Sequence, residues 1–462
     1  MDPARFEDTI VAVSTPPGRG GIGIVRLSGP EAVSVAACVF RPANAARDPL
    51  TQCSFTTCFG HVFDGEQVID EAILTVMRAP HTYTTQDVAE ISCHGGIAPV
   101  RRTLELCLKA GARVADPGEF TMRAYYYGRI DLAQAEAVAD IVNATTEAGR
   151  QAAVAQLGGA LSGCIEGFRQ RIIDLLVEVE ASIDFVDEDI ELIDAAEIAS
   201  RTSGVITDID ELLSTAQRGR VLREGLRVTI AGRPNVGKSS LLNALLRANR
   251  AIVAELPGTT RDVIEDVLTI GGLPVVLSDT AGVRDTDSPV EAEGVLRSRQ
   301  AMAAADMVLL VIDSSEPLAA EDRQLLAALD GRPHIVVMNK EDLPARVDAG
   351  EVARLASGAT VWISARDGTH IQDLEEAVSG AIWQGDVGAV EHVMLTNARH
   401  QQALEHSREG LARAAEGAAE GRYIEFVAAD LHEALAALDE ILGKTPAEDI
   451  ISRIFEQFCI GK

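Results

Sequence analysis

A glycine-rich stretch, GRPNVGKSS from Gly232 to Ser240, has the residue types and spacing of a phosphate-binding loop. Its glycines let backbone N–H groups converge on phosphate oxygens. Lys238 adds positive charge for the β- and γ-phosphates, and Ser239 offers a hydroxyl to Mg²⁺. The run LRVTIAG precedes the stretch and the helical pattern SLLNALL follows it, as this motif requires. The spacing predicts a loop that binds a nucleoside triphosphate.

Two later motifs could complete the phosphate end of the site. PGTTRD begins at Pro257 and supplies Thr260, which could contact the γ-phosphate and Mg²⁺. DTAG begins at Asp279, whose carboxylate can reach Mg²⁺ through water, and ends at Gly282, whose N–H can meet the γ-phosphate.

Two more motifs predict that the base is guanine. NKED ends at Asp342, whose carboxylate can accept hydrogen bonds from both N1–H and N2–H₂ of guanine, a pair that adenine lacks. SAR (Ser364 to Arg366) can offer backbone N–H groups to the guanine oxygen. Ligands of open α/β sheets bind at the carboxyl ends of the strands, which is where these motifs fall. The motifs therefore predict GTP contacts at Asn235, Val236, Gly237, Lys238, Ser239, Ser240, Pro257, Gly258, Thr259, Thr260, Asp279, Thr280, Ala281, Gly282, Asn339, Lys340, Asp342, Ser364, Ala365 and Arg366.

The hydrolytic machinery differs from that of GTPases with a glutamine after DTAG. Val283 stands at that position and cannot orient water. Asn235, inside the phosphate loop, could instead ligate a monovalent cation against the phosphates. Such a cation would do the electrostatic work of an arginine finger.

The spacing of apolar residues, which indicates the elements that must position these motifs, changes along the chain. Residues 1–127 alternate short apolar runs with turns and predict an α+β domain. Residues 128–222 are Ala-rich at helical spacing and predict long helices with few breaks. Residues 223–383 alternate strands with helices and predict a Ras-like parallel α/β domain, and residues 384–462 are helical again. We expect a multidomain protein in which the α/β domain interrupts a helical one.

Composition limits the class of protein. The 462 residues carry a net charge of −29, which argues against broad non-specific nucleic-acid binding. Seven cysteines at scattered spacings give no disulfide or zinc pattern, so we expect a reducing cytoplasm. We expect neither a signal peptide nor a membrane span.

GRGGIG (Gly18 to Gly23) formally fits a dinucleotide fingerprint, but IVRLSG reads as a strand where that fold needs a helix. We expect no dinucleotide site. His94 in CHGG reads as a turn-supporting residue, because no second metal ligand is spaced with it.

Beyond the four motifs of the α/β domain, the chain contains PPGRGGIGIVR, HGG, DLAQAEA and a terminal FCIGK. With these, essentially the whole chain resembles the tRNA-modification GTPase family MnmE/TrmE. The resemblance implies an N-terminal tetrahydrofolate-binding domain that dimerises, a discontinuous helical domain and an inserted G domain that pairs in a potassium-dependent way. It also implies a homodimer, a flavin-dependent partner of the MnmG/GidA kind in a heterotetramer, and a tRNA substrate modified at C5 of the wobble uridine with a carboxymethylaminomethyl-type group.

The same resemblance implies residue roles. The loop from Ala254 to Thr260 corresponds to the K-loop, so Ala254, Glu255 and Leu256 would also contact GTP. The potassium ligands would be Asn235, Ala254, Leu256 and Thr259. Magnesium would be held by Ser239 and Thr260, and catalysis would involve Glu291, which positions water, with Lys238 and Asn235. Tetrahydrofolate, in a 5-formyl or methylene form, would be held by Arg26, Glu90, Arg129 and Lys462. Cys459 is then either a reactive thiol beside the one-carbon unit or a structural thiol.

Two alternatives stay open at this stage. A ribosome-assembly or signalling GTPase would share the GTP motifs, and a folate-dependent methyltransferase acting alone would share the N-terminal domain. The N-terminal domain and FCIGK disfavour the first, and the intact GTP motifs disfavour the second.

Overall fold

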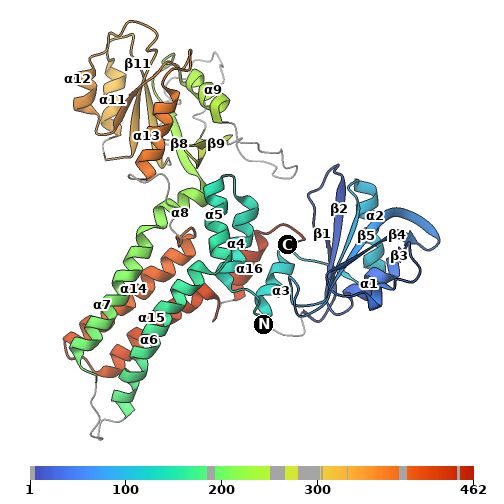
Figure 1. Cartoon of the computed structure of the whole chain (residues 1–462). Coiled ribbons are helices and arrows are strands. Elements are labelled where there is room, and N and C mark those ends of the chain that lie inside the picture. Colours follow the sequence, from blue (N-terminus) through green and yellow to red (C-terminus); the bar gives the residue numbers. More distant parts are fainter. Residues whose placement is uncertain are drawn as a thin grey trace. The chain divides into compact units, whose positions relative to one another are not determined.

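The computed structural model describes residues 6–184, 193–249, 266–278, 302, 305–329, 331–383, 393–444 and 448–461. The chain forms two compact units. Unit 1 comprises Met1–Val142, Gln156–Thr202 and Glu409–Lys462, and unit 2 comprises Asn143–Ala155 and Ser203–Arg408. Figure 1 labels the elements of both units along the chain.

Unit 1 begins with a mixed sheet in the strand order β3-β4-β5-β6-β2-β1-β7. Its strands are β1 (Ile10–Val13), β2 (Ile22–Ser28), β3 (Phe40–Pro42), β4 (Thr56–Asp64), β5 (Gln67–Met77), β6 (Val88–His94) and β7 (Arg113–Val114). Neighbouring strands are antiparallel except β1 and β7, which are parallel.

Helices α1 (Ala32–Val39) and α2 (Ile97–Lys109) pack on one face of this sheet. Alternate strand residues such as Val25, Leu74 and Ile91 point to that face and are buried there. The residues between them, among them Phe59 and Ile73, point to the other face and are exposed. At β1 this second face is covered too, because Ile10 and Ala12 are buried against Phe120, so the face is open over only part of the sheet.

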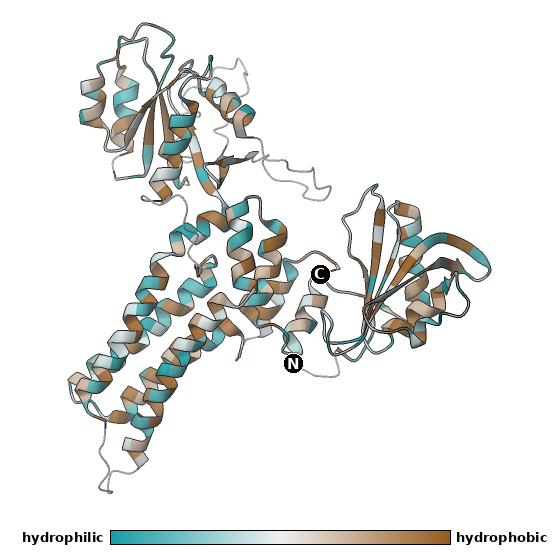
Figure 2. Cartoon of the chain, in the orientation of Figure 1, coloured by the Kyte–Doolittle hydropathy of each residue, from teal (hydrophilic) through white to brown (hydrophobic). Residues whose placement is uncertain are grey.

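Helices make up most of the rest of unit 1, namely α3 (Glu119–Tyr126), α4 (Leu132–Asn143), α6 (Ala160–Asp184), α15 (Ile424–Leu442) and α16 (Glu448–Glu456). α6 and α15 pack together through apolar residues at helical spacing, including Ile165, Ile172, Leu431 and Leu438. Figure 2 shows apolar and polar residues alternating along these helices. α7 (Ala195–Ser214) and α14 (Ala398–Ala419) contribute residues to both units.

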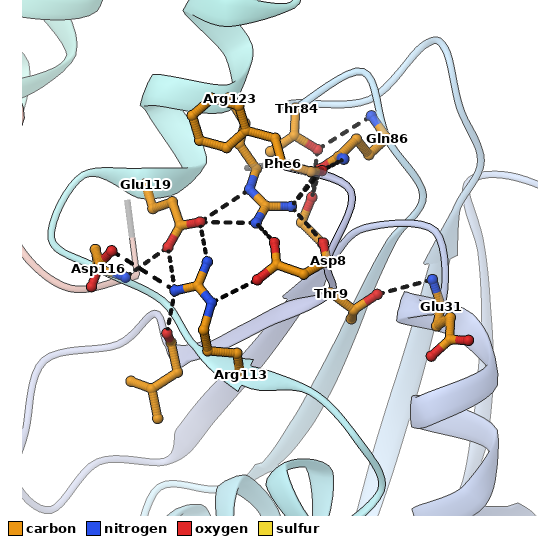
Figure 3. Close-up of polar contacts among 12 residues, drawn as sticks. Phe6, Asp8, Thr9, Glu31, Thr84, Gln86, Arg113, Asp116, Glu119 and Arg123 are labelled. Atoms are coloured by element: carbon orange, nitrogen blue, oxygen red, sulfur yellow. Dashed lines mark hydrogen bonds and ion pairs between the residues drawn. The ribbon is translucent and has the colours of Figure 1, made fainter. Parts of the chain in front are cut away.

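A buried ion-pair cluster fixes α3 to the sheet (Figure 3). Arg123 is completely buried and donates to Glu119 at 2.8 Å and to Asp8 at 2.5 Å. Arg113 donates to the same two carboxylates at 2.7 and 2.6 Å. α3 also packs against Phe455 of α16 and against Phe458, which follows that helix. The cluster therefore sets where the C-terminal helix docks.

Unit 2 contains a sheet in the order β13-β12-β11-β8-β10-β9. Its strands are β8 (Leu226–Ala231), β9 (Asp266–Ile270), β10 (Leu273–Ser278), β11 (Met307–Asp313), β12 (His334–Asn339) and β13 (Ala359–Trp362). All neighbours are parallel except β9, which pairs antiparallel with β10.

Helices cover both faces of this sheet, which explains its apolar strands. α9 (Lys238–Asn249) and α13 (Ile371–Trp383) pack on one face, while α11 (Ala320–Ala328) and α12 (Ala349–Leu355) pack on the other. Every residue of β11 is buried, as expected for a central strand of a parallel sheet. α8 (Ala216–Glu224) and all but the last two residues of α5 (Glu147–Leu157) complete the unit.

The expected fold class, with α+β, helical and Ras-like α/β parts, is confirmed. Two details differ from expectation. The long helical pattern after Asp131 is broken twice, where Thr146 accepts a hydrogen bond from the N–H of Gly149 and where Gly159 takes a left-handed φ of 88°. β9 was not expected, although Gly271 and Gly272, both at positive φ, form the tight hairpin turn before β10. Within the described residues, no helix is long and apolar enough to span a membrane.

Candidate functional site

The phosphate loop runs from the end of β8 to the start of α9, and its backbone conformation requires glycine at two positions. Gly232 and Gly237 have φ values of 146° and 100°. A Cβ at Gly232 would lie 2.4 Å from the carbonyl oxygen of Val311, and one at Gly237 would lie 2.2 Å from the amide nitrogen of Asn339. Asn235, at φ 63°, is also left-handed, and its side chain is exposed. The loop thus leads into a helix N-terminus, where backbone N–H groups favour anions.

Lys238 is held inside this loop. Its ammonium donates to the carbonyl oxygens of Gly232 at 2.8 Å and Arg233 at 2.7 Å. Burial lowers the pKa of Lys238, since desolvation disfavours the charged form. Phosphate oxygens would replace these neutral carbonyl acceptors with charged ones, which makes the loop a good fit for a polyphosphate.

The residues that the sequence predicts to recognise the base lie at the ends of β12 and β13. Ser364 donates through its hydroxyl to one carboxylate oxygen of Asp342 at 2.7 Å. Arg366 lies 3.9 Å from the other oxygen, and its own side chain is largely exposed. Lys340, at φ 66°, donates to Asp313 at 2.5 Å. Asp342 is therefore oriented before a base is bound.

Asn339 links the two ends of the site. Its side-chain amide donates to the carbonyl oxygen of Val236 at 2.8 Å and accepts from the N–H of Ala365 at 3.0 Å. The phosphate loop, the NKED loop and the SAR loop therefore meet at one buried side chain. NKED predicted a residue at this place, but the chain order alone did not reveal the bridge.

Several expected residues fall outside the described part of the chain. They are Ala254, Glu255, Leu256, Pro257, Gly258, Thr259, Thr260, Asp279, Thr280, Ala281, Gly282, Glu291 and Lys462. Ser239 and Ser240 are exposed at the start of α9. Among the described residues, no group of three or more His, Cys, Asp or Glu could hold a metal ion.

A second polar cluster lies on the open face of the unit 1 sheet. Arg26 of β2 and Glu90 of β6 face each other in register, and the Arg26 Nε donates to Glu90 at 2.7 Å. Their side chains keep exposed fractions of 26% and 21%. The Arg26 guanidinium also lies 5.8 Å from the centre of the Phe120 ring. A cation and an acid are therefore available together at a partly open site.

The C-terminal tail reaches this cluster. The carbonyl oxygen of Gly461 accepts from Arg26 at 3.3 Å and from the hydroxyl of Ser14 at 3.2 Å. Gly461 has φ 98°, and a Cβ there would lie 2.4 Å from the carbonyl oxygen of Val13. Cys459 is exposed. Ser14 had no motif to identify it.

Arg129 lies against Tyr83, which packs near the Arg26–Glu90 cluster through Phe120. Its guanidinium donates to the carbonyl oxygen of Tyr83 at 3.1 Å and sits 4.7 Å from the centre of that ring. Tyr83 packs with Phe120 in one small apolar cluster. His94, expected in a turn, is the last residue of β6, and its ring is hydrogen-bonded to Asp70 of β5 at 2.7 Å.

Comparison with known proteins covers nearly the whole chain. Residues 132–459 match the family model described as the MnmE helical domain, and residues 9–129 match the one described as GTP-binding protein TrmE N-terminus. The tRNA modification GTPase MnmE of Thermoanaerobacter pseudethanolicus is 44% identical over 459 residues, with 98% of this chain and 99% of that protein covered. The one of Chloroflexus aurantiacus is 48% identical over 460 residues, with 99% and 100% covered.

Proposed function

The chain belongs to the MnmE family of tRNA modification GTPases, and on that premise we propose how its two sites serve one reaction. Unit 2 binds and hydrolyses GTP, and unit 1 binds a folate that supplies a one-carbon unit. The product is a carboxymethylaminomethyl-type group at C5 of the wobble uridine of tRNA, formed in the cytoplasm. The main observation that supports the GTP site is the pair of hydrogen bonds made by the Asn339 side chain, which joins the phosphate loop, the NKED loop and the SAR loop.

GTP would be held at its phosphates by Lys238 and the loop N–H groups and at its base by Asp342. Magnesium would be held by Ser239 with Thr260, and it would neutralise charge on the β- and γ-phosphates. In the described residues the support is the glycine-lined loop with its lysine and the pre-oriented carboxylate of Asp342. Glu291 is proposed to position the attacking water.

Potassium is proposed as a second cation at the phosphates. The exposed side chain of Asn235, on a left-handed backbone within the phosphate loop, supports it. Ala254, Leu256 and Thr259 would complete its ligand shell. GTP turnover by the purified chain should be faster in potassium than in sodium chloride, and Asn235→Ala should remove the difference. Equal turnover of the unaltered chain in both salts would refute the potassium role.

Folate is proposed for the Arg26–Glu90 cluster. A folate carries an N–H edge on its pterin and carboxylates on its glutamate, so it needs an acid at one end and cations at the other. Glu90 supplies the acid, while Arg26, Arg129 and Lys462 supply cations. The partly exposed Arg26–Glu90 pair and the tail that Arg26 and Ser14 contact support this assignment.

The proposed assembly is a homodimer that works with a flavin-dependent MnmG/GidA-like partner on tRNA. Phe59 and Ile73, paired across β4 and β5 on the open sheet face, are 53% and 45% exposed. Exposed apolar side chains gathered on one sheet face favour a protein contact there. The alternative, a ribosome-assembly or signalling switch, is less well supported. The relatives that match this chain over nearly their whole length are named tRNA modification GTPases.

The proposed GTPase activity is tested by phosphate release from purified protein. The unaltered chain should hydrolyse GTP in potassium, and Lys238→Ala should abolish hydrolysis because the phosphates lose their cation. An inactive wild-type chain would refute the function.

A further inference from the structure

The segment from Asp313, the last residue of β11, to Asp322, in the first turn of α11, is here called the connector, and it carries two acidic residues that are almost completely buried. Asp313 is 4% exposed and Asp322 is 0% exposed. Neither belongs to a nucleotide-binding motif. A buried carboxylate is costly unless it is paired and hydrogen-bonded, so the partners of these two residues indicate what they do.

Asp322 holds the phosphate loop through Arg233. The Nε of Arg233 lies 2.9 Å from both carboxylate oxygens of Asp322. One of these oxygens also accepts from the N–H of Ala319 at 3.0 Å, at the start of α11. Glu316, in the same connector, lies 3.3 Å from the Arg233 guanidinium. The Arg233 side chain is thus tied to the connector at two carboxylates.

The backbone of Arg233 is part of the cradle for Lys238. Arg233 follows Gly232, and the carbonyl oxygens of both residues accept from the Lys238 ammonium. Gly232 is also packed so closely against β11 that a Cβ would contact the Val311 carbonyl. A shift of Arg233 would therefore displace the carbonyl groups that hold Lys238.

Asp313 holds the base loop in the same way. Its carboxylate accepts from Lys340 at 2.5 Å and from the Ser315 hydroxyl at 2.6 Å. Burial raises the pKa of Asp313, but the hydrogen bonds from Lys340 and Ser315 outweigh it and hold the pKa below its usual value. The neighbouring N–H of Ser314 donates to the carbonyl oxygen of Asn339 at 2.9 Å.

We infer that the Asp313–Asp322 connector is a common anchor for the phosphate loop and the base loop, with Asp322 and Asp313 as positioning residues. This inference rests on the proposed binding of GTP in unit 2. Neither carboxylate needs to touch the nucleotide. Asp322 acts through the side chain of Arg233 in the phosphate loop, and Asp313 acts through that of Lys340 in the NKED loop. Loops anchored to one rigid connector keep their spacing, which slows nucleotide release.

The test is the dissociation rate of a fluorescent GDP analogue from the full chain, measured by stopped flow. Asp322→Asn and Asp313→Asn should each speed dissociation about tenfold, equal to about 1.4 kcal/mol. Arg233→Gln should speed dissociation by the same factor as Asp322→Asn, because both remove the same contact. The GDP analogue should leave the double variant Arg233→Gln/Asp322→Asn more slowly than the product of the two single-variant effects predicts. The reason is that the two side chains form one contact.

Arg323→Gln is the matched control. Arg323 follows Asp322 on α11 and pairs at 2.7 Å with Glu351, but both side chains are partly exposed and neither touches a nucleotide loop in the described residues. Its dissociation rate should stay within about twofold of wild type, as expected for an exposed pair. If Asp322→Asn does not fold, Arg233→Lys tests the same contact, because lysine lacks the planar fork of arginine.

A wild-type dissociation rate in Asp322→Asn or Asp313→Asn would overturn the anchor. So would a lower melting temperature of the nucleotide-free variant without a change in rate, because that marks a purely structural role. A wild-type chain that does not bind GDP at all would instead refute the proposed function.

Discussion

At the scale of single residues, Asp342 is the clearest case of a side chain already oriented for its proposed ligand, guanine. Ser364 already holds one carboxylate oxygen at 2.7 Å, so guanine would meet an oriented acceptor. Asp342→Asn should weaken GTP binding by roughly 1.5–3 kcal/mol and admit xanthosine triphosphate, because the amide replaces an acceptor with a donor. Competition binding of the two nucleotides measures both effects. An unchanged preference for GTP would refute base reading by Asp342.

Gly461 makes a second residue-scale prediction. Its φ of 98° and the 2.4 Å approach to the Val13 carbonyl leave no room for a side chain. Gly461→Ala should displace the tail and weaken 5-formyltetrahydrofolate binding about tenfold, while GTP hydrolysis stays unchanged. Calorimetric titration gives the affinity. Gly163→Ala, in α6 with nothing near its Cβ position, is the control and should bind folate normally. Normal binding by Gly461→Ala would make the tail a structural cap.

At the scale of elements, the cluster under α3 makes the stability of unit 1 sensitive to acid (Figure 3). Burial raises the pKa of Glu119, but hydrogen bonds from Arg113, Asp116 and Arg123 outweigh it and hold the pKa below the usual 4.5. The pKa of Asp8 is lowered too, since its bonds to Arg113 and Arg123 outweigh burial. A depressed carboxylate pKa stabilises the fold above the unfolded value, and this stability is lost as pH falls through the folded value.

Hydrogen exchange of the α3 amides, corrected for intrinsic rates, should therefore show protection that falls as pH drops below about 4.5. Glu119→Gln should lower protection at neutral pH by roughly 3–5 kcal/mol, because it leaves Arg123 buried without one partner. The acid dependence should then be smaller. Arg101→Gln, which breaks an exposed pair with Glu105, should change neither. A Glu119→Gln variant with wild-type protection would contradict the account.

Elements with a strong local signal could be predicted, and those made by distant contacts could not. The apolar runs of β8, β10, β11 and β12 correspond closely to observed strands, because a strand covered on both faces must be apolar throughout. β9 was missed although Gly271–Gly272 marked its turn. Ser14 and Asp322 had no signal at all, since their partners Gly461 and Arg233 lie 447 and 89 residues away.

At the scale of the whole molecule, family membership makes the two sites parts of one tRNA modification GTPase. The residues proposed to surround the nucleotide could be predicted from order and spacing, because the phosphate loop, NKED and SAR each lie at the end of a strand of one sheet. The cluster proposed to bind folate could be predicted only through resemblance, because Arg26, Glu90 and the tail are far apart in sequence and meet through β-sheet register and helix docking.

The most direct test of the central claim is mass spectrometry of wobble uridines in tRNA from a strain that lacks this chain. C5-modified uridine should be lost in this strain, the wild-type chain should restore it, and Lys238→Ala should not. Unchanged wobble uridines in the deletion strain would contradict a role in tRNA modification. Full restoration by Lys238→Ala would separate the GTP site from that role.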